Sequence, residues 1–253
     1  MQQHSLSQCY LKSWCDPATP HGQEPYIWLI SKNGDTKRRK APKNVFTRPD
    51  RYTITLPDGQ RSQDVEKYLS EIEDFYSRVL DKINRGDALT QNDRDSLCLF
   101  AATINLRTHS LDNSWRTFQK GIHNLVIAKE KELGLPRKTS LDTEKAIEES
   151  SAGILITGID TTYSILRPKE QCIFVNSDDL GFIASDDPPP GFLPLTPHHM
   201  LLFVDDKKGF PLYVDVKQKT VDEANQLMRF HCAEEFISWK GETRSIWFDN
   251  PQQ

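Results

Sequence analysis

The chain has 253 residues, of which 37% are hydrophobic and 27% are charged, as expected for a protein that folds around its own apolar core. Its apolar runs are far shorter than the roughly 20 residues that span a membrane, and its start lacks the basic and apolar regions of a secretory signal. The five cysteines are scattered and odd in number, which disfavours a disulfide framework or a structural zinc site. We therefore expect a cytoplasmic protein without a membrane partner.

Charge is distributed unevenly along the chain, whose net charge is −4. Residues 1–110 carry 16 basic and 14 acidic residues, whereas residues 151–253 carry 9 basic and 15 acidic ones. This pattern is compatible with an acidic chamber beside a basic rim. It is not the profile of a domain that binds duplex DNA, in which basic residues are in clear excess.

The first elements expected along the chain are strands. Residues 26–30 form a predicted strand, and Asn33-Gly34 indicates a hairpin with a type I′ turn, in which both central residues have positive φ. The return strand contains the basic run Lys37-Arg-Arg-Lys40, and a further extended piece is predicted over 52–56.

Three helices are expected next. A helix is predicted over 62–84 from apolar residues at spacings of three and four, which are Val65, Leu69, Ile72, Tyr76, Val79 and Ile83. Glu66 and Glu73 lie seven residues apart, so both fall at the edge of this apolar stripe. A mostly apolar helix is predicted over 91–108, and a third helix begins near Asp112.

The remainder is predicted to be β-rich. Residues 139–150 change in composition, so the single α+β domain over 1–253 could divide into subdomains at 1–138 and 151–253. Strands are expected at 153–157, 163–166, 172–175, 181–184, 200–204 and 212–216. A late helix over 220–236 precedes a closing hairpin formed by 237–239 and 245–248. The predicted fold class is α+β, with an N-terminal β-hairpin, a central helical bundle and a C-terminal mixed or antiparallel sheet.

Four short segments resemble a bacterial family of unknown function, numbered 4238. The opening with His4 resembles the family's His-Tyr-Val-Pro start, and the helix with Glu66 and Glu73 resembles its Leu-Glu…Ile-Glu helix. Arg107-Thr108 resembles the Arg-Thr-Pro that ends its next helix. The sequence departs from the family pattern at Ser7 and His109, where the family has proline. The resemblance supplies positions but no reaction.

The fourth segment is a strand end that supplies an aspartate. Residues 174–179 resemble the family's Phe-Ile-Thr-Ser-Asp-Asn-Pro, which implies a site at Asp178 after Ser177. The segment 182–188 matches the letters better and would place the site at Asp186. The distance to the later Pro-Leu-Thr-Pro stretch favours Asp178.

These positions supply the catalytic candidates His4, Glu73, Arg107 and Asp178, which together suit phosphodiester cleavage. In one mechanism, Glu73 and Asp178 hold Mg²⁺ or Mn²⁺, which activates water, while Arg107 binds the phosphate. In the other, His4 is the general base and Arg107 stabilises the charged transition state without a metal. The substrate-binding candidates are Arg38, Arg39, Lys43 and Ser177.

The functional expectation is a hydrolase of nucleic acid or nucleotides, as in a toxin or defence effector. A buried Arg107 needs a carboxylate or a bound anion as its partner. The alternative is therefore a non-catalytic binding or scaffold module, in which Arg107 and Glu73 form a buried ion pair that holds two helices together. The basic run could contact a nucleic-acid backbone, or it could protect an edge strand from pairing. His198-His199 has no neighbouring ligand at metal-binding spacing, which favours a surface pair. No phosphate loop, dinucleotide fingerprint or common hydrolase motif is present.

Overall fold

The computed structural model describes most of the chain, namely residues 2–4, 6–49, 54–55, 61–134, 155–177, 179–189, 191–205, 209 and 211–250. Within these ranges, only the backbone is described at residues 2–4, 48–49, 54–55, 61, 109–116, 118–119 and 122. The predicted boundary at 139–150 therefore lies outside the described residues.

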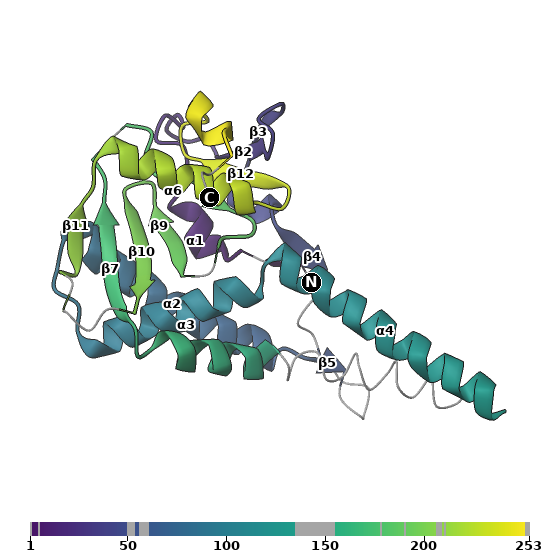
Figure 1. The fold of residues 1–253 in the computed structure, drawn as a ribbon. Helices are drawn as coiled ribbons and strands as arrows, with labels where there is room; N and C mark the ends of the chain where they lie inside the picture. The colour runs from purple at the N-terminus through teal and green to yellow at the C-terminus, as the bar shows by residue number, and fades with distance from the viewer. Residues whose placement is uncertain are drawn as a thin grey trace.

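Two helices form the centre of the molecule, α2 (Asp64–Arg85) and α3 (Gln91–Leu106). They lie against each other beneath the sheets in Figure 1. The predicted apolar stripe of α2 is buried along its whole length, as expected, and Tyr76 stacks on Phe100 of α3 with ring centroids 3.6 Å apart. This stack joins the two helices in the core.

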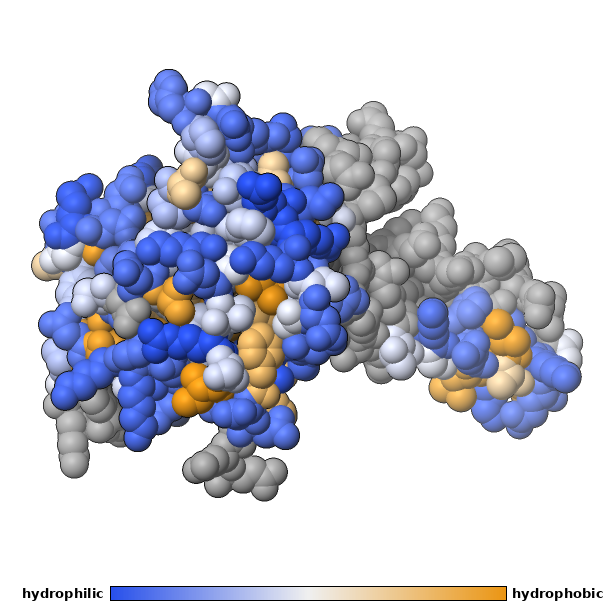
Figure 2. Space-filling model, turned by 90° about the horizontal axis from the view of Figure 1, so that it is seen from above, coloured by the Kyte–Doolittle hydropathy of each residue, from blue (hydrophilic) through white to orange (hydrophobic). Residues whose placement is uncertain are grey.

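The third helix, α4 (His109–Leu133), begins three residues before the predicted cap at Asp112, which is a helical residue. It extends away from the rest of the molecule (Figure 1) and exposes Leu125 and Leu133 near its end. Figure 2 looks down on the side where α6 and β3 lie, and most of that face is hydrophilic. Among the described residues, no helix is long and apolar enough to cross a membrane.

One four-stranded sheet has the order β11-β7-β10-β9. Its strands are β7 (Glu170–Val175), β9 (Phe192–Thr196), β10 (His199–Val204) and β11 (Tyr213–Asp215). Its neighbouring strands are antiparallel except β11 and β7, which are parallel, so the sheet is mixed as predicted. The helix α6 (Gln218–His231) follows β11.

The second four-stranded sheet has the order β3-β2-β12-β8 and combines both halves of the chain. Its strands are β2 (Ile27–Ser31), β3 (Lys37–Lys40), β8 (Ala184–Ser185) and β12 (Glu235–Ser238). The predicted hairpin is confirmed. Its turn is not of type I′, because of the two predicted central residues, Asn33 and Gly34, only Gly34 has a positive φ. The amide of Ser31 donates to the Thr36 carbonyl at 3.0 Å, which makes a four-residue loop.

The remaining elements are short. They are β1 (Gln2–His4) paired with β4 (Thr47–Pro49), β5 (Ile54–Thr55) paired with β6 (Arg61–Ser62), α1 (Gln8–Lys12), and the 3₁₀ helices η1 (Pro42–Asn44) and η2 (Ser245–Phe248). Buried apolar residues of α1, α2, α3 and both four-stranded sheets form one continuous cluster. The fold is α+β, as predicted.

A helix over 155–166 replaces two of the predicted strands, so that prediction was wrong. The β-branched residues of this stretch favour a strand locally. However, Leu155, Ile159, Tyr163 and Leu166 recur at spacings of four, four and three, which is a helical period. Ile159 and Leu166 are buried, so packing on the core decides the structure.

The predicted end of the late helix and the closing hairpin were also wrong. The helix α6 ends at His231, and beyond it the carboxylate of Asp186 accepts from the backbone amides of Ala233, Glu234 and Glu235. Residues 235–238 then pair with β2 and β8. Residues 245–248 form η2, which is held on α6 because Trp247 Nε1 donates to Asp222 Oδ1 at 2.8 Å.

Candidate functional site

The structure brings together two of the predicted catalytic residues. Arg107 is the C-terminal cap of α3, and its Nη1 donates to Glu73 Oε1 of α2 at 2.8 Å. The Arg107 side chain is 2% exposed and the Glu73 side chain is 22% exposed. The guanidinium therefore lies beneath the carboxylate, and solvent reaches the pair from the Glu73 side.

A third charged residue, Glu66, belongs to the same cluster, two helical turns before Glu73 on α2. Its Oε1 is buried without a hydrogen-bond partner among the described residues. Burial raises the pKa of the Glu66 carboxyl, the Arg107 guanidinium partly offsets this rise, and the charge of Glu73 adds to it. The cluster thus combines an ion-paired carboxylate with a carboxyl whose pKa is raised by burial.

The helix α1 lies beside this cluster. Ser7 caps α1 by accepting from the Tyr10 amide, and its hydroxyl lies 3.1 Å from the Cys9 thiol. Cys9 Sγ in turn contacts the Glu73 carbonyl at 3.9 Å. Burial raises the pKa of the Cys9 thiol, so Cys9 favours its neutral form and is a poor nucleophile. Ser7, where the family opening has proline, therefore serves as a helix cap.

The turn between β9 and β10 is linked to α2 through Tyr76. The Tyr76 hydroxyl, one turn after Glu73, donates to the Leu195 carbonyl at 3.3 Å. The next residue, Thr196, accepts at its Oγ1 from the backbone amides of His198 and His199 at 3.0 and 3.1 Å. These two amides use both lone pairs of the hydroxyl oxygen, so the Thr196 hydroxyl donates its hydrogen to His199 Nδ1, 3.0 Å away.

These contacts fix the hydrogen positions of both histidine rings. Because His199 Nδ1 accepts, its Nε2 carries the hydrogen, and burial lowers the pKa of His199 to about 4. His198 Nδ1 lies 3.0 Å from the Asn176 carbonyl, which can only accept, so Nδ1 carries the hydrogen of that ring. The ring of His198 also packs edge-on against Trp239. A surface pair was expected here, but both rings are partly buried and hydrogen-bonded.

Through His198, this turn contacts the end of β7, where Ser177 and Asp178 were predicted to belong to the site. Asn176 and Ser177 follow β7, and Ser177 is exposed. Asp178 and the side chain of His4 lie outside the described residues, so their predicted roles stay predictions. Asp186, the other candidate aspartate, is buried and accepts from three backbone amides, which is an anchoring role.

The remaining substrate-binding candidates lie in another part of the fold. Arg38 forms a bidentate ion pair with Glu235, in which Nε donates to Oε1 at 3.0 Å and Nη2 donates to Oε2 at 2.7 Å. Lys43 is ion-paired with Glu24. Arg39 lies over the rings of Tyr26 and Trp28. In the part of the chain that the structure describes, none of the three cations contacts Glu73 or Arg107.

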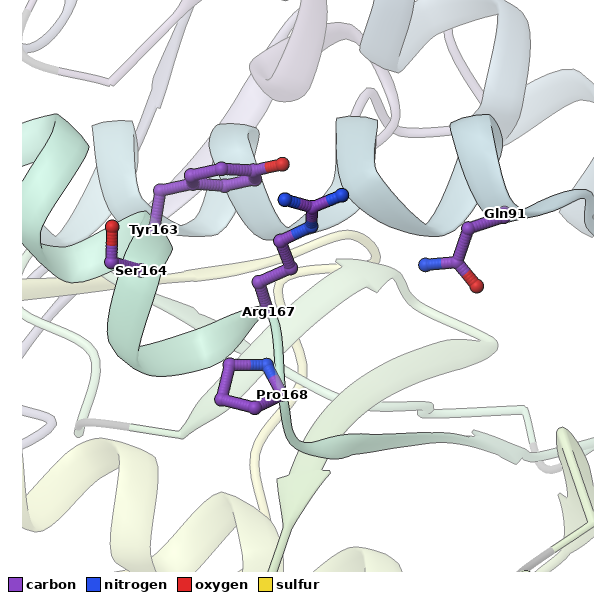
Figure 3. A pocket seen from close by; sticks show the side chains of 5 residues that line it. All are labelled: Gln91, Tyr163, Ser164, Arg167 and Pro168. Atoms are coloured by element: carbon purple, nitrogen blue, oxygen red, sulfur yellow. The ribbon is translucent and has the colours of Figure 1, made fainter.

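A separate open pocket of about 460 Å³ lies between the start of α3 and the end of the 155–166 helix (Figure 3). It is lined by Gln91, Tyr163, Ser164, Arg167 and Pro168. Gln91 and Arg107 are at opposite ends of α3, about 24 Å apart at 1.5 Å per residue. This pocket is therefore not part of the Glu66–Glu73–Arg107 cluster.

Metal binding was predicted at Glu73 together with Asp178. Within the described ranges, no three residues among His, Cys, Asp and Glu are grouped so that they could hold a metal ion. Of the predicted pair, Glu73 is already bonded to Arg107, and a cation at Glu73 would have to share its carboxylate with that guanidinium. The metal site stays a prediction.

Together, the fold and this cluster define an α+β protein with two carboxyls and an arginine between its central helices. The chain belongs to the family described as "Protein of unknown function (DUF4238)", which matches residues 2–241. This match confirms the resemblance found in the sequence and covers nearly the whole chain. No curated protein and no solved structure gives a significant match.

Proposed function

We propose that the protein is an intracellular hydrolase that cleaves phosphodiesters of nucleic acids or nucleotides at the Glu66–Glu73–Arg107 cluster. The observation that carries this proposal is the buried Glu66 oxygen without a partner, next to a carboxylate that is ion-paired. Two carboxyls in such different environments are the usual arrangement for a general acid beside an ionised partner. The five free cysteines support a reducing compartment.

In this proposal, Glu66 is the general acid, because its raised pKa keeps a proton available for the leaving oxygen. Glu73 is ion-paired with the Arg107 guanidinium. With Glu66 protonated, the charges of Glu73 and Arg107 cancel, and an anionic phosphodiester is not repelled. Arg107 acts from beneath the carboxylates as a positioning residue, since its side chain is 2% exposed.

Activation of water requires a further group, for which the sequence offers two candidates. His4 could act as the general base, or Glu73 and Asp178 could hold Mg²⁺ or Mn²⁺. The two routes differ in their response to chelation. EDTA stops the metal-dependent route and leaves the His4 route unchanged.

A second candidate function is a non-catalytic binding or scaffold module. The burial of Arg107 favours it, because an arginine sealed between two helices needs Glu73 for stability whether or not there is a substrate. In that case the same cluster joins α2 to α3 and performs no chemistry.

The proposal is tested by incubating purified wild-type protein with labelled RNA, DNA and dinucleotides, with Mg²⁺, with Mn²⁺ and with EDTA. Glu66→Gln is the test variant, and Glu71→Gln, an exposed carboxyl on the same helix, is the matched control. Cleavage by wild type and Glu71→Gln, with at least about 100-fold slower cleavage by Glu66→Gln, supports the proposal. Equal cleavage rates for all three proteins contradict it, and the absence of any cleavage leaves the scaffold module as the better account.

A further inference from the structure

The edge strand β3 carries four consecutive cations, of which only one is ion-paired with a residue that the structure describes. Arg38 is ion-paired with Glu235. Lys37, Arg39 and Lys40 are exposed, and among the described residues none of them has a carboxylate partner. Among the described strands, β3 pairs only with β2, so these cations lie along an edge of the sheet.

Two aromatic rings lie under two of these cations. The register pairs Arg39 with Trp28, and strand alternation places Lys37 on the same face. Lys37 Nζ lies 4.5 Å from the centroid of the Trp28 ring, and Arg39 Cζ lies 5.0 Å from the Tyr26 ring and 5.3 Å from the Trp28 ring. At these distances the rings attract the cations through cation–π interactions, which hold flexible cationic side chains in place.

The Trp28 and Tyr26 rings are in turn positioned by their own contacts with neighbouring residues. Trp28 Nε1 donates to Asp16 Oδ2 at 2.6 Å, and Tyr26 packs edge-on against Trp28 with centroids 5.8 Å apart. Gly241 lies so close that a Cβ atom there would be 2.5 Å from Trp28 Cδ2 and 2.8 Å from Lys37 Cε. Glycine at position 241 therefore lets the backbone pack directly against the Trp28 ring and the end of the Lys37 side chain.

We propose that the face formed by Tyr26, Trp28, Lys37, Arg39 and Lys40, here called the β3 face, binds single-stranded nucleic acid. The unpaired cations bind backbone phosphates, and the exposed side of the Arg39 guanidinium stacks on a base. Edge protection alone would need only the charges, without rings that orient them. This inference deepens the proposed function by naming a single strand as its polymer, but binding does not depend on cleavage.

The binding test uses fluorescence anisotropy with labelled 20-nucleotide oligo-U and oligo-dT in EDTA, at several salt concentrations. The test variant is Lys37→Ser/Arg39→Ser. The control is Lys217→Ser/Lys219→Ser, which removes the same charge at the same spacing. Both lysines are exposed, Lys217 at the N-cap of α6 and Lys219 in its first turn. A third variant, Arg39→Lys, keeps the charge but lacks the planar group.

We expect the test variant to bind about ten-fold more weakly. The slope of the logarithm of its binding constant against the logarithm of salt concentration should be smaller in magnitude by about 1.4, for two lost phosphate contacts. Arg39→Lys should keep the wild-type slope and bind about three-fold more weakly, and the control should bind like wild type. No binding by wild type, equal losses in test and control variants, or equal affinity for polyglutamate labelled in the same way would each overturn the proposal. Binding without cleavage would contradict the proposed hydrolase and leave the β3 face intact.

Discussion

Arg107 Nη1 and Glu73 Oε1 lie 2.8 Å apart, although the two residues are 34 positions apart in the sequence. Their ion pair joins the end of α3 to the middle of α2, next to the protonatable Glu66. The structural and the catalytic roles proposed for this cluster use the same atoms, so stability and activity have to be measured separately.

Removing the arginine tests the structural role of the pair. Arg107→Met leaves Glu73 without its cation at a mostly buried position, and we expect the free energy of unfolding to fall by about 3 kcal/mol. Urea unfolding measures this change. Arg78→Met is the control, because Arg78 is exposed on α2, and it should change stability by less than about 1 kcal/mol. A loss in Arg107→Met no larger than in the control would show that the pair does not stabilise the fold.

The raised pKa of Glu66 has a consequence for stability. Folded Glu66 keeps its proton where the unfolded chain has lost it, so the folded state binds more protons above the ordinary pKa of 4.5. The contribution of Glu66 to stability therefore declines as pH rises through the folded pKa. Glu66→Gln lacks this decline. We expect the variant to be more stable than wild type at pH 7 and equally stable near pH 4.

Chemical denaturation at both pH values measures this difference. Glu71→Gln controls for the loss of a carboxyl from α2 and should stay within about 0.5 kcal/mol of wild type throughout. A Glu66→Gln variant that is less stable than wild type at pH 7 would show that the ionised form of Glu66 is stabilising, contrary to the burial of its unbonded oxygen.

His199 should remain neutral well into the acidic range. Its pKa of about 4 in the folded state lies below the ordinary value of 6.5, so the unfolded chain binds more protons between these values. Stability is therefore lost as pH falls from about 6.5 to 4. Nitrogen-15 NMR at pH 5.5 should show a neutral His199 ring with hydrogen on Nε2, bonded at Nδ1 by Thr196. A doubly protonated His199 ring at pH 5.5 would refute this assignment.

The sequence was most informative where local pattern and packing agree. The period of α2 predicted its buried stripe. The position of Arg107 in an apolar helix predicted a carboxylate or a bound anion beside it, and the structure shows the carboxylate of Glu73. The 155–166 helix was missed because its β-branched residues favour a strand, whereas the decisive burial of Ile159 and Leu166 is tertiary.

Other features of the site depend on contacts that no local pattern contains. The pairing of β2 with β12 joins residues about 200 positions apart, and the bonding of the two histidine rings depends on Thr196 and Asn176. A partial signal for the histidine pair was present, since a threonine two or three residues before His198 and His199 is typical of a side-chain-bonded turn. The helical spacing placed Glu66 at the edge of the apolar stripe of α2. It could not show that one of the Glu66 carboxyl oxygens is buried without a hydrogen bond to a described residue.

The central claim is that Glu66 supplies a proton during phosphodiester cleavage, and the pH dependence of the cleavage rate tests it most directly. In wild type, kcat/KM should fall on the alkaline side as Glu66 loses its proton. Glu66→Gln should be at least about 100-fold slower and lack that alkaline fall, while Glu71→Gln follows wild type. An alkaline fall that persists unchanged in Glu66→Gln, at a wild-type rate, would contradict the account.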